Sequence, residues 1–307
     1  MFDRTRLRGI IVPAVTPFEE DGCTVSERGV RQLVDFLVAQ GVHGIFVGGT
    51  TGEAAALDDL QWRRLVQAAS QALRGRIPLL AGVIAPTTAL AVARARLAAD
   101  LGADVVVATT PYYYLPSERE TVAHFRAIVD ATSLPVLLYN IPQNTKAPIT
   151  LAACQQLAAL ERVVGLKDSA GDVTAFRRAV LALRAGGRDF RMLLGTDHLT
   201  DVAVLVGAQG TVPSLGNVAG RELVAAYEAA VAGDWARSTR HQERAAALAR
   251  LYDVRDGLHQ TGIIVGLKCA LSLLGVAAGP PAPPVRPPSE EETRAVEAVL
   301  REAGLLR

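Results

Sequence analysis

Lysine is scarce in this sequence, although positive charge is not. Of 32 lysine and arginine residues, only three are lysines: Lys146, Lys167 and Lys268. Arginine therefore supplies nearly all of the cationic surface. Each lysine becomes a candidate for nucleophilic chemistry, which arginine cannot perform because it does not lose its proton in proteins. The formal net charge is only +1, so no electrostatic field favours nucleic acid or a membrane surface as a partner.

Several other signals are missing. Cysteines occur only at positions 23, 154 and 269, a spacing that predicts reduced thiols in a cytoplasmic protein and no disulfide framework. The five histidines form no zinc-ligand cluster, so we expect no metal. No apolar run is long enough to cross a membrane, and no signal peptide is recognisable. No G-x-G-x-x-G follows the first predicted strand, which weakens a dinucleotide-binding fold, and we expect no cofactor.

The sequence does contain a regular alternation of short apolar runs and amphipathic segments. Strands are expected at 10–15, 43–47, 77–81, 104–107, 135–138, 163–167, 191–194 and 210–212. Helices are expected at 25–40, 87–101, 118–131, 151–160, 173–184, 199–206 and 220–231. A further helix is expected after the turn at 48–53 and ends at about residue 73. Eight strand-then-helix units predict an α/β fold. A doubly wound sheet is the alternative, but the count of eight favours a closed (β/α)8 TIM barrel.

The alternation stops after residue 232. The remaining sequence predicts helices at 234–251, 257–275 and 289–303. We therefore expect a barrel over residues 1–232 that carries the active site, and a C-terminal helical region over 233–307. Between the last two helices, the proline-rich residues 279–288 predict an extended polyproline-II spacer on the surface.

One predicted strand ends in a lysine. The apolar run 163–166 is typical of a buried parallel strand, and Lys167 follows it directly. A buried ammonium without a partner is costly, so burial favours the neutral amine, which attacks carbonyl carbon. The alternative is that Lys167 reaches solvent or pairs with a carboxylate at the strand end. This stretch alone does not decide between the two.

The turns after other predicted strands also carry reactive groups. In a barrel these turns gather at the C-terminal face, where active sites are built. Thr50 and Thr51 lie in a Gly-Thr-Thr-Gly turn that suits an anion, and Tyr139 and Tyr113 supply phenols. Taken singly, each is explained as well by a tight turn or by packing. Together with Lys167 they meet the needs of Schiff-base catalysis on a 2-oxo acid: an amine, carboxylate donors and a proton shuttle.

These motifs resemble those of the dihydrodipicolinate synthase / N-acetylneuraminate lyase family of class I, pyruvate-handling aldolases. The resemblance covers nearly the whole chain. It rests on the motifs at 15–18, 49–53, 110–113, 139–142, 165–168 and 195–197. It implies a TIM barrel with a C-terminal helical region, pyruvate as substrate or product, and a homotetramer built from tight dimers.

The resemblance also implies a role for individual residues. Lys167 matches the Schiff-base lysine, and Tyr139 matches the tyrosine that shuttles protons. Thr50 and Thr51 match the pair that binds the pyruvate carboxylate and relays protons. Tyr113 is similar to the tyrosine that reaches into the neighbouring subunit's site in the synthases. Lys268 lies where the family often carries a lysine, and we interpret it as structural.

The pattern departs from the synthases at one position. There, an arginine two residues after the proline of the Tyr-Asn-x-Pro motif binds the carboxylate of the second substrate. The matching residue here is Asn144, a neutral amide that cannot form a charge-assisted clamp. Another arginine could reach the same place from a different loop. In the lyases, a Gly-x-Asp-Glu segment and a later serine contact sugar hydroxyls. The expected substrate-binding residues here are Asn144, Gly195, Asp197, His198 (where the lyases have Glu), Val212 and Ser214.

Four functions remain open. The first is an aldolase acting on a 4-hydroxy-2-oxo acid or a 2-keto-3-deoxy sugar acid, with pyruvate and an aldehyde as partners. The second is a synthase condensing pyruvate with aspartate semialdehyde, which Asn144 disfavours. The third is a dehydratase of a 2-keto-3-deoxy sugar acid, which no sequence feature separates from the first. The fourth is a ligand-binding barrel without turnover, which the presence of Lys167, Tyr139 and the threonine pair disfavours.

Overall fold

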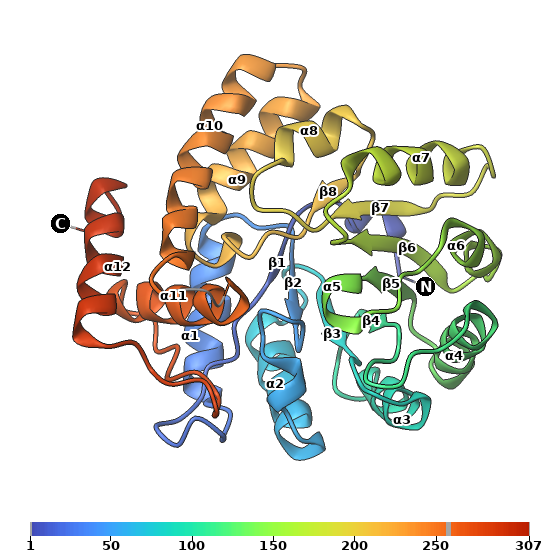
Figure 1. Cartoon of the computed structure of the whole chain (residues 1–307), viewed down its shortest axis with the longest axis horizontal. Coiled ribbons are helices and arrows are strands. Elements are labelled where there is room, and N and C mark those ends of the chain that lie inside the picture. The colour runs from blue at the N-terminus through green and yellow to red at the C-terminus, as the bar shows by residue number, and fades with distance from the viewer. Residues whose placement is uncertain (1, 256–258, 307) are drawn as a thin grey trace.

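The structure is a computed structural model that describes residues 2–255 and 259–306. Eight parallel strands pair in chain order, and β8 pairs with β1 to close the barrel (Figure 1). The strands are β1 (Gly9–Pro13), β2 (Gly44–Val47), β3 (Leu79–Gly82), β4 (Val105–Thr109), β5 (Val136–Asn140), β6 (Val163–Asp168), β7 (Arg191–Leu194) and β8 (Gly210–Thr211). The predicted (β/α)8 barrel is confirmed.

Helices surround this barrel and continue beyond it. The barrel helices are α1 (Glu27–Ala39), α2 (Asp59–Leu73), α3 (Thr88–Ala98), α4 (Glu118–Ala131), α5 (Pro142–Thr145), α6 (Leu151–Ala158), α7 (Val173–Arg184), α8 (Thr200–Leu205) and α9 (Gly216–Val231). The tail contains α10 (Trp235–Ala247), α11 (His259–Leu273) and α12 (Glu290–Glu302). Three 3-10 helices complete the described elements: η1 (Arg4–Arg6), η2 (Ala54–Ala56) and η3 (Leu248–Tyr252).

The strands form because their apolar side chains are buried on both faces. Ile11, Phe46, Leu80 and Val107 belong to a cluster of buried side chains from the strands, and a larger cluster joins strands and helices. Nearly continuous apolar strands are expected where helices cover a parallel sheet. The barrel interior is thus packed, and an active site is expected in the loops at the carboxyl ends of the strands.

Short polar side chains begin the helices after the strands. Ser26, Asp58, Thr87 and Ser117 each accept a hydrogen bond from a backbone N–H in the first turn of α1, α2, α3 and α4. Such caps satisfy N–H groups that have no partner within the helix. These caps fix where each loop ends and its helix begins. The loop residues before each cap therefore remain available at the carboxyl ends of the strands.

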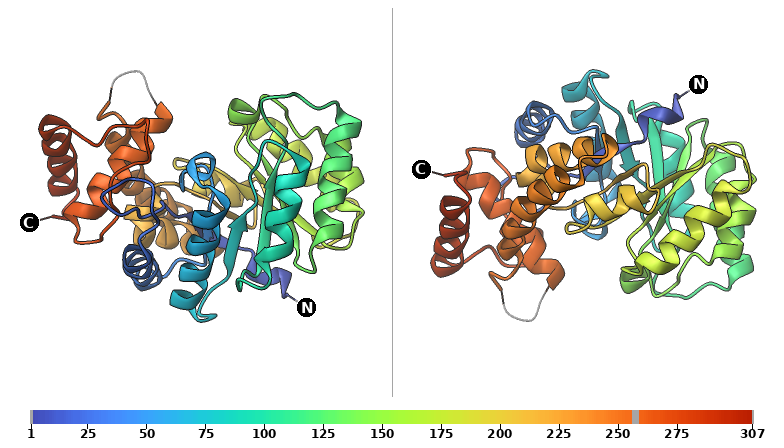
Figure 2. Two further views of the ribbon diagram at one scale, coloured as in Figure 1. Left: turned by 90° about the horizontal axis from the view of Figure 1, so that it is seen from below. Right: turned by 90° about the horizontal axis from the view of Figure 1, so that it is seen from above.

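The tail packs on one side of the barrel. Figure 2 shows α11 and α12 far from α4 and α6, and α10 lies against α9. The helix predicted at 234–251 is divided into α10 and η3. The start of the helix predicted at 257–275 lies outside the described residues. The barrel–tail boundary at residue 232, just after α9, remains a prediction.

The prediction of a surface spacer at 279–288 is wrong for part of that segment. Pro281 and Ala282 are buried. The N–H of Ala282 donates to Glu53 Oε2 at 2.7 Å, and the carbonyl of Pro280 accepts from Lys268 Nζ at 2.8 Å. We call residues 280–285 the strap. The predicted extended conformation is also wrong for residues 283–285, which form a turn in which the Val285 N–H donates to the Ala282 carbonyl at 3.1 Å. Proline composition does not report which surface the chain lies against.

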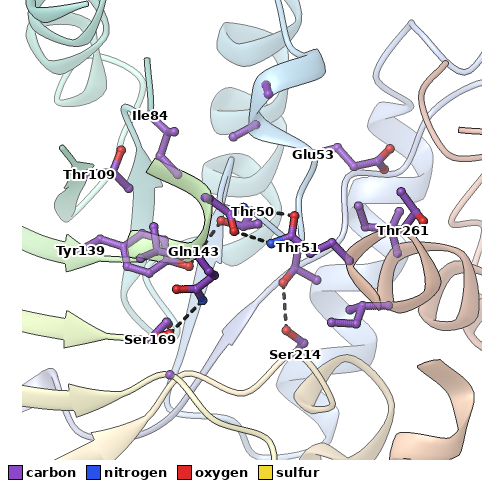
Figure 3. A pocket seen from close by; sticks show the side chains of 18 of the residues that line it. Thr50, Thr51, Glu53, Ile84, Thr109, Tyr139, Gln143, Ser169, Ser214 and Thr261 are labelled. Carbon is purple, nitrogen blue, oxygen red and sulfur yellow. Dashed lines mark hydrogen bonds between the residues drawn. The ribbon is translucent and has the colours of Figure 1, made fainter. Parts of the chain in front are cut away.

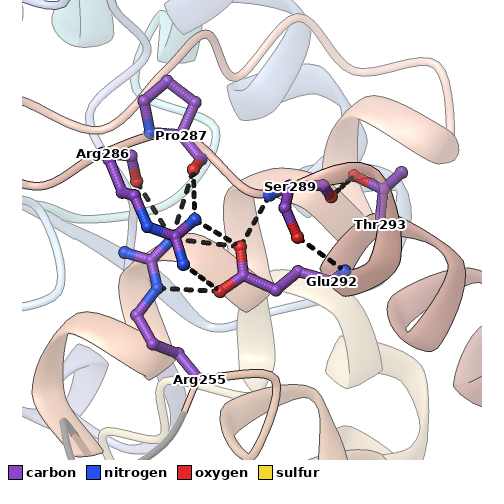
Figure 4. A network of polar contacts seen from close by, with 6 residues as sticks. All are labelled: Arg255, Arg286, Pro287, Ser289, Glu292 and Thr293. Carbon is purple, nitrogen blue, oxygen red and sulfur yellow. Dashed lines mark hydrogen bonds and ion pairs between the residues drawn. The ribbon is translucent and has the colours of Figure 1, made fainter.

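A charged network holds the chain that follows the strap (Figure 4). Arg255 and Arg286 both donate to the carboxylate of Glu292 in α12, at 2.7–3.3 Å. Arg255 also donates to the carbonyls of Arg286 and Pro287. These hydrogen bonds hold the pKa of Glu292 well below its usual range. Because Arg255 precedes α11 and Glu292 belongs to α12, the network joins the segment before α11, the chain that follows the strap and α12.

No helix in the two described ranges is both long and apolar enough to cross a membrane.

Candidate active site

A cavity of about 660 Å³ opens at the carboxyl ends of the strands (Figure 3). Barrel and tail both line it. Of the predicted site residues, it brings together Thr50, Thr51, Tyr139, Asn144, Lys167, Gly195, Asp197, Val212 and Ser214. Tyr113 and His198 are not among the described lining residues. Sequence analysis missed Tyr112, Gln143, Ser169, Gln260 and the strap residues, which also line the cavity.

Lys167 is the only lysine that lines the cavity in the described chain. Its side chain is 3% exposed, and Nζ lies 3.8 Å from the ring centroid of Tyr139 and 5.0 Å from that of Phe46. The ion pairs formed by the described residues include Lys268 but not Lys167. The described residues therefore do not support the alternative of a strand-end ion pair. Among them the amine of Lys167 has no counter-ion, and it faces the cavity.

The neighbouring carboxylate, Asp168, is directed elsewhere. Successive side chains on a strand point to opposite faces, so Asp168 does not face the same side as Lys167. Its Oδ1 accepts from Asn140 Nδ2 at 3.1 Å and from the Ala170 N–H at 2.8 Å. Burial raises the pKa of Asp168. In the same strand, Gly165 is required because a Cβ there would lie 2.2 Å from the Arg191 carbonyl oxygen of β7.

Tyr139 stands beside Lys167 on the adjacent strand β5, in direct register. Its ring meets that of Phe46 edge-to-face, with centroids 6.2 Å apart, which fixes its orientation. Its hydroxyl lies 3.3 Å from Thr50 Oγ1, and either oxygen can donate. The structure thus places a phenol next to the amine and connects it to a second hydroxyl, an arrangement suited to moving protons.

The turn that holds Thr50 and Thr51 is tightly constrained. A Cβ on Gly49 would lie 2.7 Å from the Phe46 ring, and one on Gly52 would lie 2.8 Å from the Ala14 carbonyl. Thr51 Oγ1 lies 3.0 Å from Ser214 Oγ. Within residues 2–255 and 259–306, neither threonine's backbone N–H donates a hydrogen bond. Free N–H groups beside hydroxyls form a site suited to a carboxylate.

Glu53 connects this turn to the tail. The backbone of Glu53 has φ of 56°, a left-handed conformation that few non-glycine residues adopt. Its Oε1 lies 2.5 Å from Lys268 Nζ, and both side chains are buried. Burial lowers the pKa of Lys268 to about 8, although Glu53 opposes that shift. Lys268 is thus engaged in the ion pair and in its bond to Pro280, as a structural residue would be.

The third lysine is remote from this chemistry. Lys146 is exposed at the end of α5, and its Nζ donates to the Gln143 carbonyl at 2.8 Å. It does not line the cavity as far as the structure describes it. Of the three amines, Lys167 alone is positioned to meet a ligand.

The mouth of the cavity is polar, but its groups bond one another. Asn144 and Gln260 exchange side-chain amide hydrogen bonds between α5 and α11. Asp197 Oδ1 accepts from the Leu215 N–H at 2.8 Å, and Oδ2 accepts from the Tyr252 hydroxyl at 3.0 Å. Burial raises the pKa of Asp197. No arginine is among the lining residues that the structure describes, so none takes the place left by Asn144.

Two predicted residues lie outside the cavity of this single chain. Tyr113 has positive φ (79°) and is 83% exposed, and its ring stacks edge-to-face on the equally exposed Tyr114. Tyr112 lines the cavity instead. His198 is exposed, and its backbone N–H donates to Thr196 Oγ1. The roles predicted for all these site residues remain predictions.

Comparisons with known proteins agree with this architecture. The family model of the dihydrodipicolinate synthetase family matches residues 6–303. A 4-hydroxy-tetrahydrodipicolinate synthase of Phenylobacterium zucineum is 36% identical over 299 residues, which cover 97% of this chain and 98% of the relative. An uncharacterized DapA-like lyase of Halobacterium salinarum is 36% identical over 307 residues, with 99% and 96% covered.

Solved structures give the same result. A prophage protein of the dihydrodipicolinic acid synthase family from E. coli K12, in complex with pyruvate, superposes with a TM-score of 0.91 at 27% identity. That match covers 97% of this chain and 99% of the other. Dihydrodipicolinate synthase from Bacteroides thetaiotaomicron superposes with a TM-score of 0.90 at 33% identity, with 96% and 98% covered. The chain therefore belongs to the dihydrodipicolinate synthetase family, whose members are class I aldolases, lyases that act on pyruvate through a lysine Schiff base.

Proposed function

We propose that this enzyme cleaves and forms the C3–C4 bond of a 4-hydroxy-2-oxo acid, with pyruvate as one product or substrate and Lys167 as the Schiff-base residue. The observation that carries the proposal is the buried amine of Lys167, which forms no ion pair with the residues that the structure describes and lies beside the phenol of Tyr139. A positioned amine and an adjacent proton carrier are what imine chemistry on a ketone requires.

In this proposal each group has a step in the cleavage direction. Thr50, Thr51 and the backbone N–H groups of their turn bind the substrate carboxylate. Lys167 Nζ attacks C2, and loss of water gives the imine. Tyr139 donates its hydroxyl proton to that departing water, and the resulting phenolate accepts the C4 hydroxyl proton while the C3–C4 electron pair moves toward the imine, releasing the aldehyde and leaving an enamine. Protonation at C3 and addition of water then release pyruvate and restore the amine.

The Lys167 assignment is tested by trapping the imine. Incubation with pyruvate and borohydride is expected to add one reduced adduct per chain, on Lys167, because reduction converts the imine to a stable secondary amine. With only three lysines, peptide mapping is unambiguous. Adducts on Lys146 or Lys268, or no adduct at all, would refute the assignment.

We further propose that the protein works in the cytoplasm as a homotetramer, a dimer of dimers in which Tyr113 reaches a neighbouring active site. Support comes from two adjacent, largely exposed tyrosines beside the cavity, since exposed apolar patches mark interaction surfaces. Light scattering is expected to give a tetramer mass at working concentration. A fully active monomer would contradict both the assembly and this role for Tyr113.

A second candidate is condensation of pyruvate with aspartate semialdehyde, since several relatives bear the synthase name. The described cavity offers that substrate's carboxylate no arginine. A charge-assisted hydrogen bond is worth about 1.5–3 kcal/mol, or roughly ten- to a hundredfold in rate. We therefore expect the wild-type enzyme to be a poor synthase.

Asn144→Arg tests this charge argument directly. It is expected to raise kcat/KM for aspartate semialdehyde by roughly ten- to a hundredfold, because it supplies the missing cation. Asn144→Gln is the matched control, since it lengthens the side chain without adding charge. Efficient condensation by the wild-type enzyme would instead establish the synthase function.

A further inference from the structure

One wall of the cavity is apolar and is built from two distant parts of the chain. Ala54–Ala56 of η2 contribute from the barrel, while Ile263, Ile264 and residues 282–285 contribute from the tail. Glu53 holds the two parts together, because it immediately precedes η2 and accepts a hydrogen bond from the Ala282 N–H. We call this set of residues the apolar wall.

Four of the polar side chains that line the cavity beside this wall are already bonded. Both oxygens of Glu53 are engaged, by Lys268 and by the Ala282 N–H. Asn144 and Gln260 bond each other, and both oxygens of Asp197 accept hydrogen bonds. A substrate tail rich in hydroxyls would compete with these bonds for the same groups, which lowers the binding energy that it gains from them.

The inner end of the cavity differs. Thr50, Thr51, Tyr139 and Ser214 place four hydroxyls near the amine of Lys167, enough for the carboxylate and for the C4 hydroxyl. Polar groups therefore surround the reactive amine, and the apolar wall is left to contact another part of a substrate. The cavity of about 660 Å³ leaves ample room for that part, given that about 150 Å³ accommodates a benzene ring.

We infer that the aldehyde released or captured by this enzyme carries an uncharged apolar group, branched alkyl or aryl, that packs on the apolar wall. The inference rests on the proposed aldolase function and specifies its second substrate. Burial of that group drives recognition, since removing apolar surface from water is favourable and needs no dedicated polar partner.

A matched pair of aldehydes tests the inference. Isovaleraldehyde and glyceraldehyde have equal numbers of non-hydrogen atoms but opposite polarity, and benzaldehyde extends the apolar series. With saturating pyruvate, kcat/KM is expected to be roughly 10- to 100-fold higher for isovaleraldehyde than for glyceraldehyde, the range that apolar pockets provide. Equal values, or a preference for glyceraldehyde or aspartate semialdehyde, would overturn the inference.

Ile264→Asn tests whether the apolar wall causes the preference for isovaleraldehyde. It is expected to lower kcat/KM for isovaleraldehyde about tenfold while changing that for glyceraldehyde less than twofold. Leu181→Asn, on the exposed face of α7, is the matched control and should change neither. Equal losses of kcat/KM for both aldehydes would show that the apolar wall does not recognise the apolar group. If Ile264→Asn does not fold, the wild-type ratio decides alone.

Borohydride trapping separates this inference from the proposed function. A wild-type adduct on Lys167 together with a preference for glyceraldehyde would overturn only the apolar substrate class. Absence of the adduct would overturn the aldolase assignment itself, and the inference with it.

Discussion

Tyr139→Phe is expected to lower turnover by roughly 10²–10⁴, the usual loss when a positioned general acid–base group is removed. The change removes only the hydroxyl, which lies 3.3 Å from Thr50 Oγ1, and keeps the ring that packs against Phe46 and Lys167. Imine formation, followed by borohydride trapping, should persist at a reduced rate. Steady-state pyruvate release measures the effect.

Two controls sharpen this result. Tyr227→Phe removes a buried phenol from α9, where the ring packs on His43, and should leave turnover within twofold of wild type. Thr50→Val should be costly alone but add little to Tyr139→Phe, since residues of one hydrogen-bonded chain are not additive. Turnover close to wild type in Tyr139→Phe would exclude the phenol from the mechanism.

Lys268→Met is expected to destabilise the protein by about 3–5 kcal/mol. It leaves the buried carboxylate of Glu53 without a counter-charge, and breaking a buried pair by removing one partner costs this much. The urea midpoint, compared at one protein concentration, measures the loss. Because Lys268 also donates to the Pro280 carbonyl, the strap should loosen as well.

The double variant Glu53→Gln with Lys268→Met separates charge from packing. It removes both charges, and replacing a buried pair by neutral groups is often close to neutral in stability. It should therefore recover most of the loss. Lys146→Met, at an exposed lysine, is the matched control and should change stability by less than about 0.5 kcal/mol. A double variant as unstable as Lys268→Met would show that packing, not charge, holds the strap.

Local sequence signals sufficed wherever local chemistry decides the structure. The bounds of α4, α7 and β7 agree with the predictions, because capping by Ser117 and Asp172 and alternation of apolar residues are properties of neighbouring residues. The helix predicted from residue 220 begins earlier, at Gly216, because a kink at Ala219 joins an extra turn to it. Glycine and asparagine in that turn obscured the signal.

At the inner end of the candidate site, both the residues and their proximity could be predicted. Lys167 and Tyr139 lie at the carboxyl ends of β6 and β5, and the threonine pair follows β2, so the closure of the barrel alone brings them together. At the mouth, Asn144 and Asp197 were predicted without their partners. The rest of the site depends on contacts between distant positions: Asn144 with Gln260, and Glu53 with Lys268. No propensity or period encodes such contacts. The proline-rich strap is a clear example, because its composition predicted neither its burial nor the turn at residues 283–285.

The scarcity of lysine has a practical consequence. Of the three lysine side chains only Lys146 is exposed, and it adjoins Gln143 and Asn144, which line the cavity. An amine-reactive fluorophore would therefore react with Lys146, at the rim of the cavity, in preference to the two buried lysine side chains of the folded protein. Such a label would convert the enzyme into an optical sensor of its own ligands without any engineered cysteine.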